Sequence, residues 1–124
     1  MKRLTPKEEQ IMQILWRLKR AFVNDILKEL PDPKPHYNTV SSLVRFLEDK
    51  GYIGHKAYGK THEYFPTVSV EAYRKQSLYK LVSGYFSNSY KSVISSLARE
   101  EKISVDELKE IIEMIENQDS ESNE

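Results

Sequence analysis

The 124-residue sequence contains no cysteine. This absence excludes disulfides, thiol nucleophiles and thiol-based redox sensing, and it makes the cytoplasm the expected location. No hydrophobic run approaches the roughly 18 residues of a membrane-spanning helix, and the start MKRLTPKEEQ lacks the apolar core of a signal peptide. We therefore expect a cytoplasmic protein that does not bind the membrane directly.

Glycine is also scarce. There are four glycines, and none lies in a GxGxxG or GxxxxGK arrangement that would cradle a phosphate. Ser41 and Ser42 have no obvious base nearby, and the acidic residues fall on predicted helix faces. The sequence therefore predicts no enzyme, no catalytic residue and no cofactor.

The formal net charge is zero, but the charges are unevenly distributed. Residues 1–76 hold 14 Lys and Arg against 9 Asp and Glu, a net charge of +5, whereas residues 77–124 hold 5 against 10. The N-terminal part is therefore suited to a polyanion such as a nucleic acid, although segregation of this size also arises by chance.

Residues 5–50 predict three helices. Thr5, Pro6 and Glu8 form a helix start with a capping box, and a second, shorter helix is expected at about 23–30. Three prolines in residues 31–35 interrupt the chain. The third helix follows, with an apolar stripe at i, i+3, i+4 and i+7 and a stop at Gly51; the stripe is Val40, Leu43, Val44 and Leu47.

After Gly51 the hydrophobic period changes from 3.6 to 2. Residues 52–56 and 61–65 are expected to be two strands, joined around residues 57–60. Three helices followed by a hairpin predict a winged helix-turn-helix, a mainly α fold with a small β-hairpin wing. We expect this domain to span residues 1–69.

The outer face of the third helix has short polar side chains and one arginine. Such a face fits the DNA major groove, because Asn can bond adenine and Arg can bond guanine through paired contacts. A helix with a solvated polar face explains the pattern equally well. The candidate groove-reading residues are Asn38, Thr39, Ser41, Ser42 and Arg45.

The hairpin adds candidate phosphate contacts. Lys56 and Lys60 flank the expected turn and Tyr58 lies at its tip. If the hairpin turns around Tyr58 and Gly59, His55 and His62 lie opposite each other. Two ligands alone rarely make a metal site, so no metal is predicted.

From Ser69 onward the chain is predicted to be helical, with a tail at residues 117–124 that is expected to be disordered. A segment of about 45 residues seldom buries enough surface to fold alone, so we interpret residues 70–116 as a helical dimerisation domain. Folding back onto the chain's own winged helix is the alternative. The expected contact residues are Leu78, Leu81, Val82, Tyr85, Phe86, Leu108, Ile111, Ile112 and Ile115.

Three stretches together resemble the penicillinase-repressor (BlaI/MecI/CopY) family of bacterial transcriptional repressors. They are LTPKEEQIMQILW, NTVSSLVRFLEDKGYI and the hairpin ending EYFP, and the resemblance extends over about residues 4–116. It implies a homodimer that binds a palindromic double-stranded operator and represses resistance genes of the beta-lactam type. It also implies release through a membrane sensor metalloprotease.

Two departures from the family pattern concern regulation. The beta-lactam branch is cleaved at an Asn-Phe pair, and the equivalent place here is Ser96-Leu97, so this pair is only a possible cleavage region. The copper-responsive branch binds metal through Cys-x-Cys pairs, which this sequence lacks. A protein-docking winged helix is the competing function, and Phe46 on the flank of the third helix is the residue that favours it.

Overall fold

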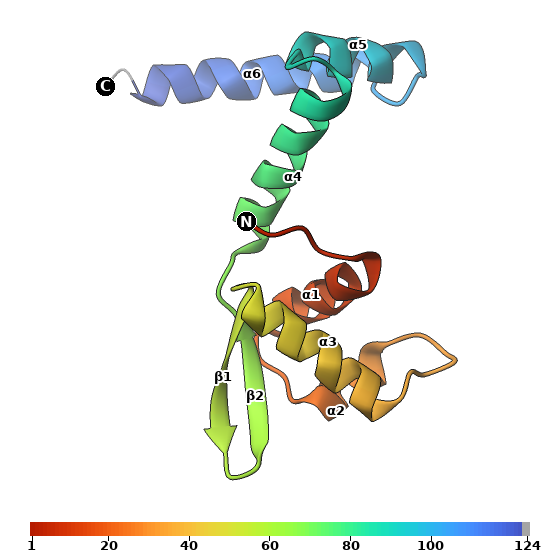
Figure 1. The fold of residues 1–124 in the computed structure, drawn as a ribbon. Helices are drawn as coiled ribbons and strands as arrows, with labels where there is room; N and C mark the ends of the chain where they lie inside the picture. The colour runs from red at the N-terminus through yellow and green to blue at the C-terminus, as the bar shows by residue number, and fades with distance from the viewer. Residues whose placement is uncertain (123–124) are drawn as a thin grey trace. The chain divides into compact units, whose positions relative to one another are not determined.

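The computed structural model describes the backbone of residues 1–122 and the side chains of residues 1–114, 116 and 117. The order of elements is α1 (Pro6–Leu18), α2 (Val23–Glu29), α3 (Tyr37–Asp49), β1 (Ile53–Tyr58), β2 (Thr61–Pro66), α4 (Val70–Tyr85), α5 (Tyr90–Arg99) and α6 (Val105–Ser122) (Figure 1). The chain divides into two compact units, residues 1–75 and 76–124. This mainly helical fold with one hairpin confirms the predicted fold class.

None of the helices within residues 1–122 combines the length and the hydrophobicity needed to cross a membrane.

The N-terminal unit is built around one hydrophobic core. Its three helices each bury one apolar face, and the core is closed by Tyr52, which precedes β1, and by Ile53 and Tyr64 of the hairpin. Trp16 packs at the edge of this core and donates a hydrogen bond from Nε1 to the carbonyl of Val68 at 2.9 Å. The buried apolar residues of these helices are Ile11, Met12, Ile14, Leu15, Val23, Ile26, Val40, Val44 and Leu47.

Gly51 ends α3 as predicted. Its φ of 84° lies in the left-handed region that glycine adopts without strain. The N–H of Gly51 donates to the carbonyl of Glu48, and the N–H of Tyr52 donates to that of Leu47, both at 3.0 Å. The chain is thereby turned directly into β1.

The strands of the hairpin are longer than the sequence predicts, and they pair in a different register. Tyr58 pairs with Thr61, so the loop contains only Gly59 and Lys60, and Gly59 has a φ of 63°. A positive φ at the first of two loop residues suits glycine and the twist of a tight hairpin. His55 consequently pairs with Tyr64, and the expected pairing of His55 with His62 is wrong.

A buried ion pair joins α1 to the end of α3. Glu8 is 1% exposed, and its Oε1 accepts hydrogen bonds from Lys50 Nζ at 2.7 Å and from the Thr5 N–H at 2.9 Å. Lys50 Nζ also donates to the Arg3 carbonyl at 3.0 Å. Burial alone would raise the pKa of Glu8, but the hydrogen bonds from Lys50 and Thr5, with the positive charge of Lys50, outweigh it and lower the pKa.

The first turns of α4 belong to the N-terminal unit. The Tyr73 hydroxyl donates to Glu9 Oε2 at 2.9 Å, and the Tyr73 ring lies 5.3 Å from that of Trp16. The boundary therefore falls after Lys75 and not after Ser69.

The C-terminal unit has well-defined helix starts. Ser89 and Ser104 cap α5 and α6 through their hydroxyls, which accept from the N–H groups of Ser92 and Glu107, each at 3.1 Å. α6 continues to Ser122, which differs from the disordered tail expected from residue 117; residues 123–124 lie outside the described residues.

Apolar side chains of the C-terminal unit are mostly exposed. Among its described side chains, only Val82, at 2% exposure, is buried, so Val82 packs within its own protomer and departs from the expected contact set. Phe86 and Leu108 are half-buried, and the Ile115 side chain lies outside the described residues. The large exposed apolar side chains are Leu78, Tyr79, Leu81, Tyr85, Tyr90, Ile94, Leu97, Val105, Ile111, Ile112 and Met114.

Replacing Lys50 tests the ion pair. Lys50→Met should lower the free energy of unfolding by about 3 kcal/mol at pH 7, because it leaves the Glu8 carboxylate buried without its counter-charge. Urea unfolding followed by circular dichroism measures this loss. Lys28→Met, at an exposed position of α2, is the control and should change stability by less than about 0.5 kcal/mol.

The pH dependence gives a second check on this pair. Because the folded-state pKa of Glu8 is lowered from its usual value of 4.5, its stabilising contribution is present at neutral pH and is lost as the pH falls through the lowered pKa. In Lys50→Met burial is left less opposed and raises this pKa. The difference in stability between the two proteins should therefore shrink between pH 7 and pH 4; a constant difference would contradict the assignment.

Candidate nucleic-acid interface

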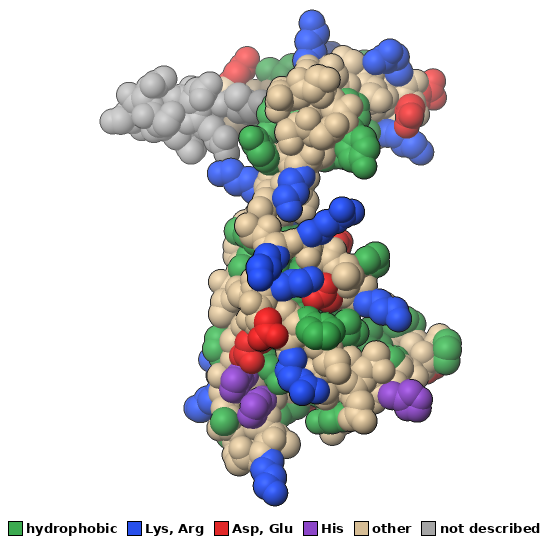
Figure 2. Space-filling model, viewed as in Figure 1, with side chains coloured by type: hydrophobic (Ala, Val, Ile, Leu, Met, Phe, Trp, Pro, Cys, Tyr) green, Lys and Arg blue, Asp and Glu red, His purple; other side chains and the backbone are tan. Residues whose placement is uncertain are grey.

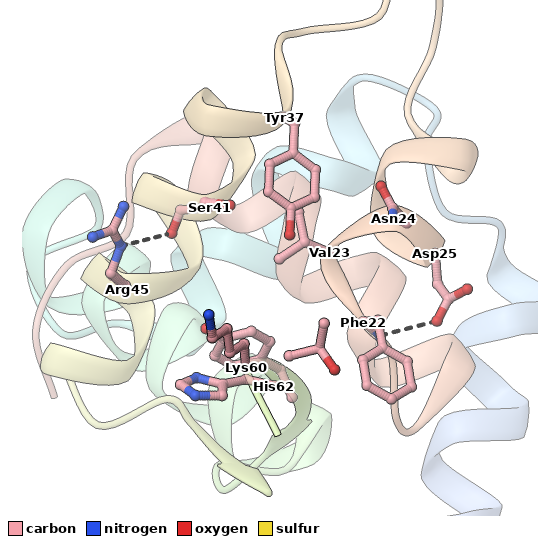
Figure 3. Close-up of a pocket in the computed structure, with 11 residues that line it drawn as sticks. Phe22, Val23, Asn24, Asp25, Tyr37, Ser41, Arg45, Lys60 and His62 are labelled. Carbon is pink, nitrogen blue, oxygen red and sulfur yellow. Dashed lines mark hydrogen bonds between the residues drawn. The ribbon is translucent and has the colours of Figure 1, made fainter. Parts of the chain in front are cut away.

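An open cleft of about 560 Å³ lies between α3, the start of α2 and the hairpin. Figure 3 shows Tyr37, Ser41 and Arg45 projecting from α3 on one side, with Lys60 and His62 of the hairpin on another. The remaining lining residues are Phe22, Val23, Asn24, Asp25, Thr61 and Tyr64. The cleft is therefore formed by the start of α2, one face of α3, and the loop and second strand of the hairpin.

The α3 side of the cleft follows directly from helical spacing. Tyr37, Ser41 and Arg45 are four residues apart and therefore lie on one face, while the apolar stripe of α3 faces the core. Arg45 Nε donates to the Ser41 carbonyl at 3.4 Å, a long hydrogen bond. The Arg45 side chain is exposed, so its guanidinium remains able to bind a ligand.

The hairpin side is held in place by contacts with the helices. Ala21, between α1 and α2, forms a β-bridge with Tyr64, with hydrogen bonds of 3.0 and 2.8 Å in the two directions. At the far end of the hairpin, the Tyr58 ring lies 5.8 Å from that of Phe22. These contacts hold the hairpin against the rest of the unit, and Lys60 lines the cleft beside them.

The cleft is electrostatically suited to an anion. Arg45 and Lys60 contribute two positive charges. Asp25 is the acidic residue in the lining, and its Oδ2 accepts from the Phe22 N–H at 2.9 Å. Cationic side chains that converge on a cleft attract phosphate groups.

The structure brings together three of the sequence-predicted site residues, Ser41, Arg45 and Lys60. On α3, Asn38 and Thr39 are exposed and Ser42 is half-buried, but none of them lines the cleft. On β1, Lys56 pairs in register with Glu63, and its Nζ lies 5.3 Å from the Tyr58 ring centroid. Lys56 and Tyr58 also lie outside the cleft lining.

Sequence reasoning missed several cleft residues. Tyr37, 47% exposed, is at the first position of α3, and its spacing from Ser41 and Arg45 is the signal that indicates it. Asn24 and Thr61 reach the cleft only through tertiary packing, so no local pattern identifies them.

Beside the cleft, a polar cluster links α3 to the hairpin. His55 Nδ1 lies 2.5 Å from Glu48 Oε2, and the rings of His55 and His62 are stacked, 4.1 Å apart and 7° from parallel. In Figure 2, two histidine side chains lie together beside acidic side chains. Burial raises the pKa of Tyr64, and the nearby Glu48 carboxylate raises it further.

A metal site is not formed by this cluster. Across the described part of the chain, no group of three or more His, Cys, Asp or Glu residues is placed to hold a metal ion.

Comparison with known proteins identifies the family. The model of the family described as "Penicillinase repressor" matches residues 4–117. The chain belongs to the penicillinase repressor family. This is a family of DNA-binding transcriptional repressors and not of enzymes. The match to the family model confirms the family resemblance drawn from the sequence.

Curated relatives of this penicillinase repressor family member match over nearly their whole length. The methicillin resistance regulatory protein MecI of Staphylococcus aureus (strain N315) is 24% identical over 109 residues, covering 87% of this chain and 89% of that protein. The penicillinase repressor of Bacillus licheniformis is 20% identical over 118 residues, covering 91% and 89%.

Solved structures confirm the fold. The DNA-binding domain of the repressor BlaI aligns with a TM-score of 0.51 and 23% identity, covering 59% of this chain and 94% of that one. The complex structure of hsRosR-S4 aligns with a TM-score of 0.56 and 18% identity, covering 99% and 95%.

Proposed function

We propose that this penicillinase repressor family member is a homodimer that binds a palindromic operator through α3 and the hairpin wing. The observation that carries the proposal is the placement of Arg45 on α3 and Lys60 on the wing at one cleft. A base edge can be read from a helix in the major groove while the adjacent phosphate backbone is held by a wing.

The proposed contacts divide by chemistry. Arg45 reads a base, and the short side chains of α3 allow the helix to approach the groove. The wing residues neutralise phosphate and set the register of the protein on the duplex. The proposed DNA contacts are Asn38, Thr39, Ser41, Ser42, Arg45, Lys56, Tyr58 and Lys60.

Dimerisation through the C-terminal unit is supported by its exposed apolar side chains. Ile111 and Ile112 of α6 and Leu78 and Leu81 of α4 are each more than 40% exposed in the protomer. A second copy would remove these side chains from water, and a two-fold dimer would place two α3 helices about one DNA turn apart, roughly 34 Å.

The regulated genes and the signal are proposed from the relatives. Their names refer to methicillin resistance and to penicillinase, so we propose that the protein acts in the cytoplasm on a beta-lactam resistance operon. Release would follow cleavage by a membrane sensor protease. Ser96 and Leu97 lie inside α5, where their carbonyls accept from the N–H groups of Glu100 and Lys102, so cleavage there requires α5 to open locally.

A protein-docking role is the alternative. Phe46 is 54% exposed on α3 and, with Leu43, lines a second cavity of about 480 Å³. An exposed apolar patch favours a protein partner. The two functions differ in the effect of salt, because DNA binding weakens steeply as salt increases and apolar docking does not.

Arg45→Ala tests base reading by α3. The reference DNA is the duplex that the unaltered protein selects from a random pool. The variant should lose about 1–3 kcal/mol of binding free energy on this duplex and should relax preference at one base position, measured by fluorescence anisotropy on the duplex and its single-base variants. Arg17→Ala, at an exposed position of α1, is the control. Equal loss on all sequences would make Arg45 a phosphate contact.

Lys60→Ala tests the wing. Loss of one phosphate contact should weaken binding to every duplex and lower the slope of log affinity against log salt by about one unit. Titrations between about 50 and 200 mM salt measure this slope, with Lys7→Ala on α1 as the control. An unchanged slope would remove the wing from the interface.

Ile112→Asp tests the dimer. Because Ile112 is 53% exposed in the protomer, the substitution should leave the core of the N-terminal unit intact but place a charge in the dimer contact. Sedimentation should show monomers, and operator affinity should collapse. Asn117→Asp, on the opposite face of the same helix, adds the same charge and should remain dimeric. A dimeric Ile112→Asp protein would place the contact elsewhere.

A further inference from the structure

We propose that Glu48 and His55 form a strut that positions the wing for DNA, and that Glu48 is therefore a positioning residue although its charge opposes DNA. This inference rests on the proposed DNA-binding function. It assigns a role to an acidic side chain that neither base reading nor phosphate contact explains.

The strut connects two elements that carry separate parts of the interface. Glu48 lies on α3, three residues after Arg45, and His55 lies on β1. A carboxylate only accepts hydrogen bonds, so Nδ1 of His55 carries the proton and donates to Glu48 Oε2 at 2.5 Å. Among the described side chains, no other hydrogen bond joins a side chain of α3 to a side chain of the hairpin.

The His55 ring is fixed from a second direction. It stacks on His62 at 4.1 Å, and the Tyr64 ring lies 5.8 Å away. His62 itself lines the cleft together with Arg45 and Lys60. A shift of His55 would therefore move the cleft wall from which Lys60 projects.

Charge alone predicts the opposite effect from positioning. Glu48 is about 30% exposed, so its negative charge opposes the approach of phosphate. Removing the charge should tighten binding to any DNA if Glu48 has no other role. If Glu48 holds the wing, removing it should weaken binding to any DNA despite the more favourable charge.

Glu48→Ala is compared with Asp49→Ala on the duplex selected by the unaltered protein and on a scrambled duplex. Asp49 is exposed on the same turn of α3, and its removal changes the net charge equally. Asp49→Ala should bind both duplexes as tightly as the unaltered protein, or more tightly. Glu48→Ala should lose roughly tenfold in affinity for both duplexes, because the Lys60 contact that it removes is made to phosphate; this is the lower end of the range for a hydrogen bond to a charged group.

The salt slope distinguishes positioning from a general loss of structure. Glu48→Ala should lower the slope by about one unit, because the Lys60 contact is no longer made. Adding Lys60→Ala to Glu48→Ala should then have no further effect. Glu48→Gln, whose amide oxygen still accepts a hydrogen bond from His55, should recover most of the affinity.

Several results would overturn the strut. They are Glu48→Ala binding as tightly as Asp49→Ala, an unchanged salt slope, or losses from Glu48→Ala and Lys60→Ala that simply add. If Glu48→Ala melts at a markedly lower temperature, His55→Ala provides the same comparison from the wing side. Failure of the unaltered protein to prefer any duplex would overturn the proposed function and the strut together. The outcomes that overturn the strut alone are seen only in the variants.

Discussion

The presentation of α3 depends on the buried ion pair between Glu8 and Lys50. Glu8 closes the capping box of α1, and Lys50 is the C-cap of α3, so one carboxylate fixes the start of one helix and the end of another. Burying a charge costs several kcal/mol unless its partner is in place. Glu8 Oε2 has no hydrogen-bond partner among the described residues, so the carboxylate depends on the contacts of Oε1. The pair therefore favours a single placement of α3 against α1.

The cleft is shaped by residues that do not line it. Gly51 turns the chain out of α3, Ile53 anchors β1 in the core, and Ala21 holds β2 through its bridge to Tyr64. Because these contacts fix the backbone, exposed side chains such as Arg45 and Lys60 need not stabilise the fold. They are therefore available for a ligand, and replacing them should change binding more than stability.

The sequence predicted the features that depend on local chemistry and could not predict those that depend on tertiary packing. Thr5 and Glu8 cap α1, Gly51 ends α3, and Ser104 starts α6, all as their spacing indicated. The hairpin register was missed, because a two-residue loop after Tyr58 requires knowing which side of each strand meets the core. The contact of Glu48 with His55 depends on how α3 packs against β1, so no sequence pattern could indicate it.

The two units differ in the way their apolar side chains are covered. The N-terminal unit buries a contiguous core within one chain. Among the described side chains of the C-terminal unit, only that of Val82 is buried. About 45 residues with so little covered surface gain too little from burial to offset their conformational entropy. In the proposed dimer, a second copy would supply the burial that these helices lack. In a dimer, the free energy that holds α4 to α6 together would depend on protein concentration. Dilution would then separate the two N-terminal units of the dimer and also destabilise the C-terminal helices. Operator occupancy would therefore fall more steeply as the protein is diluted than it would for a protomer that folds independently.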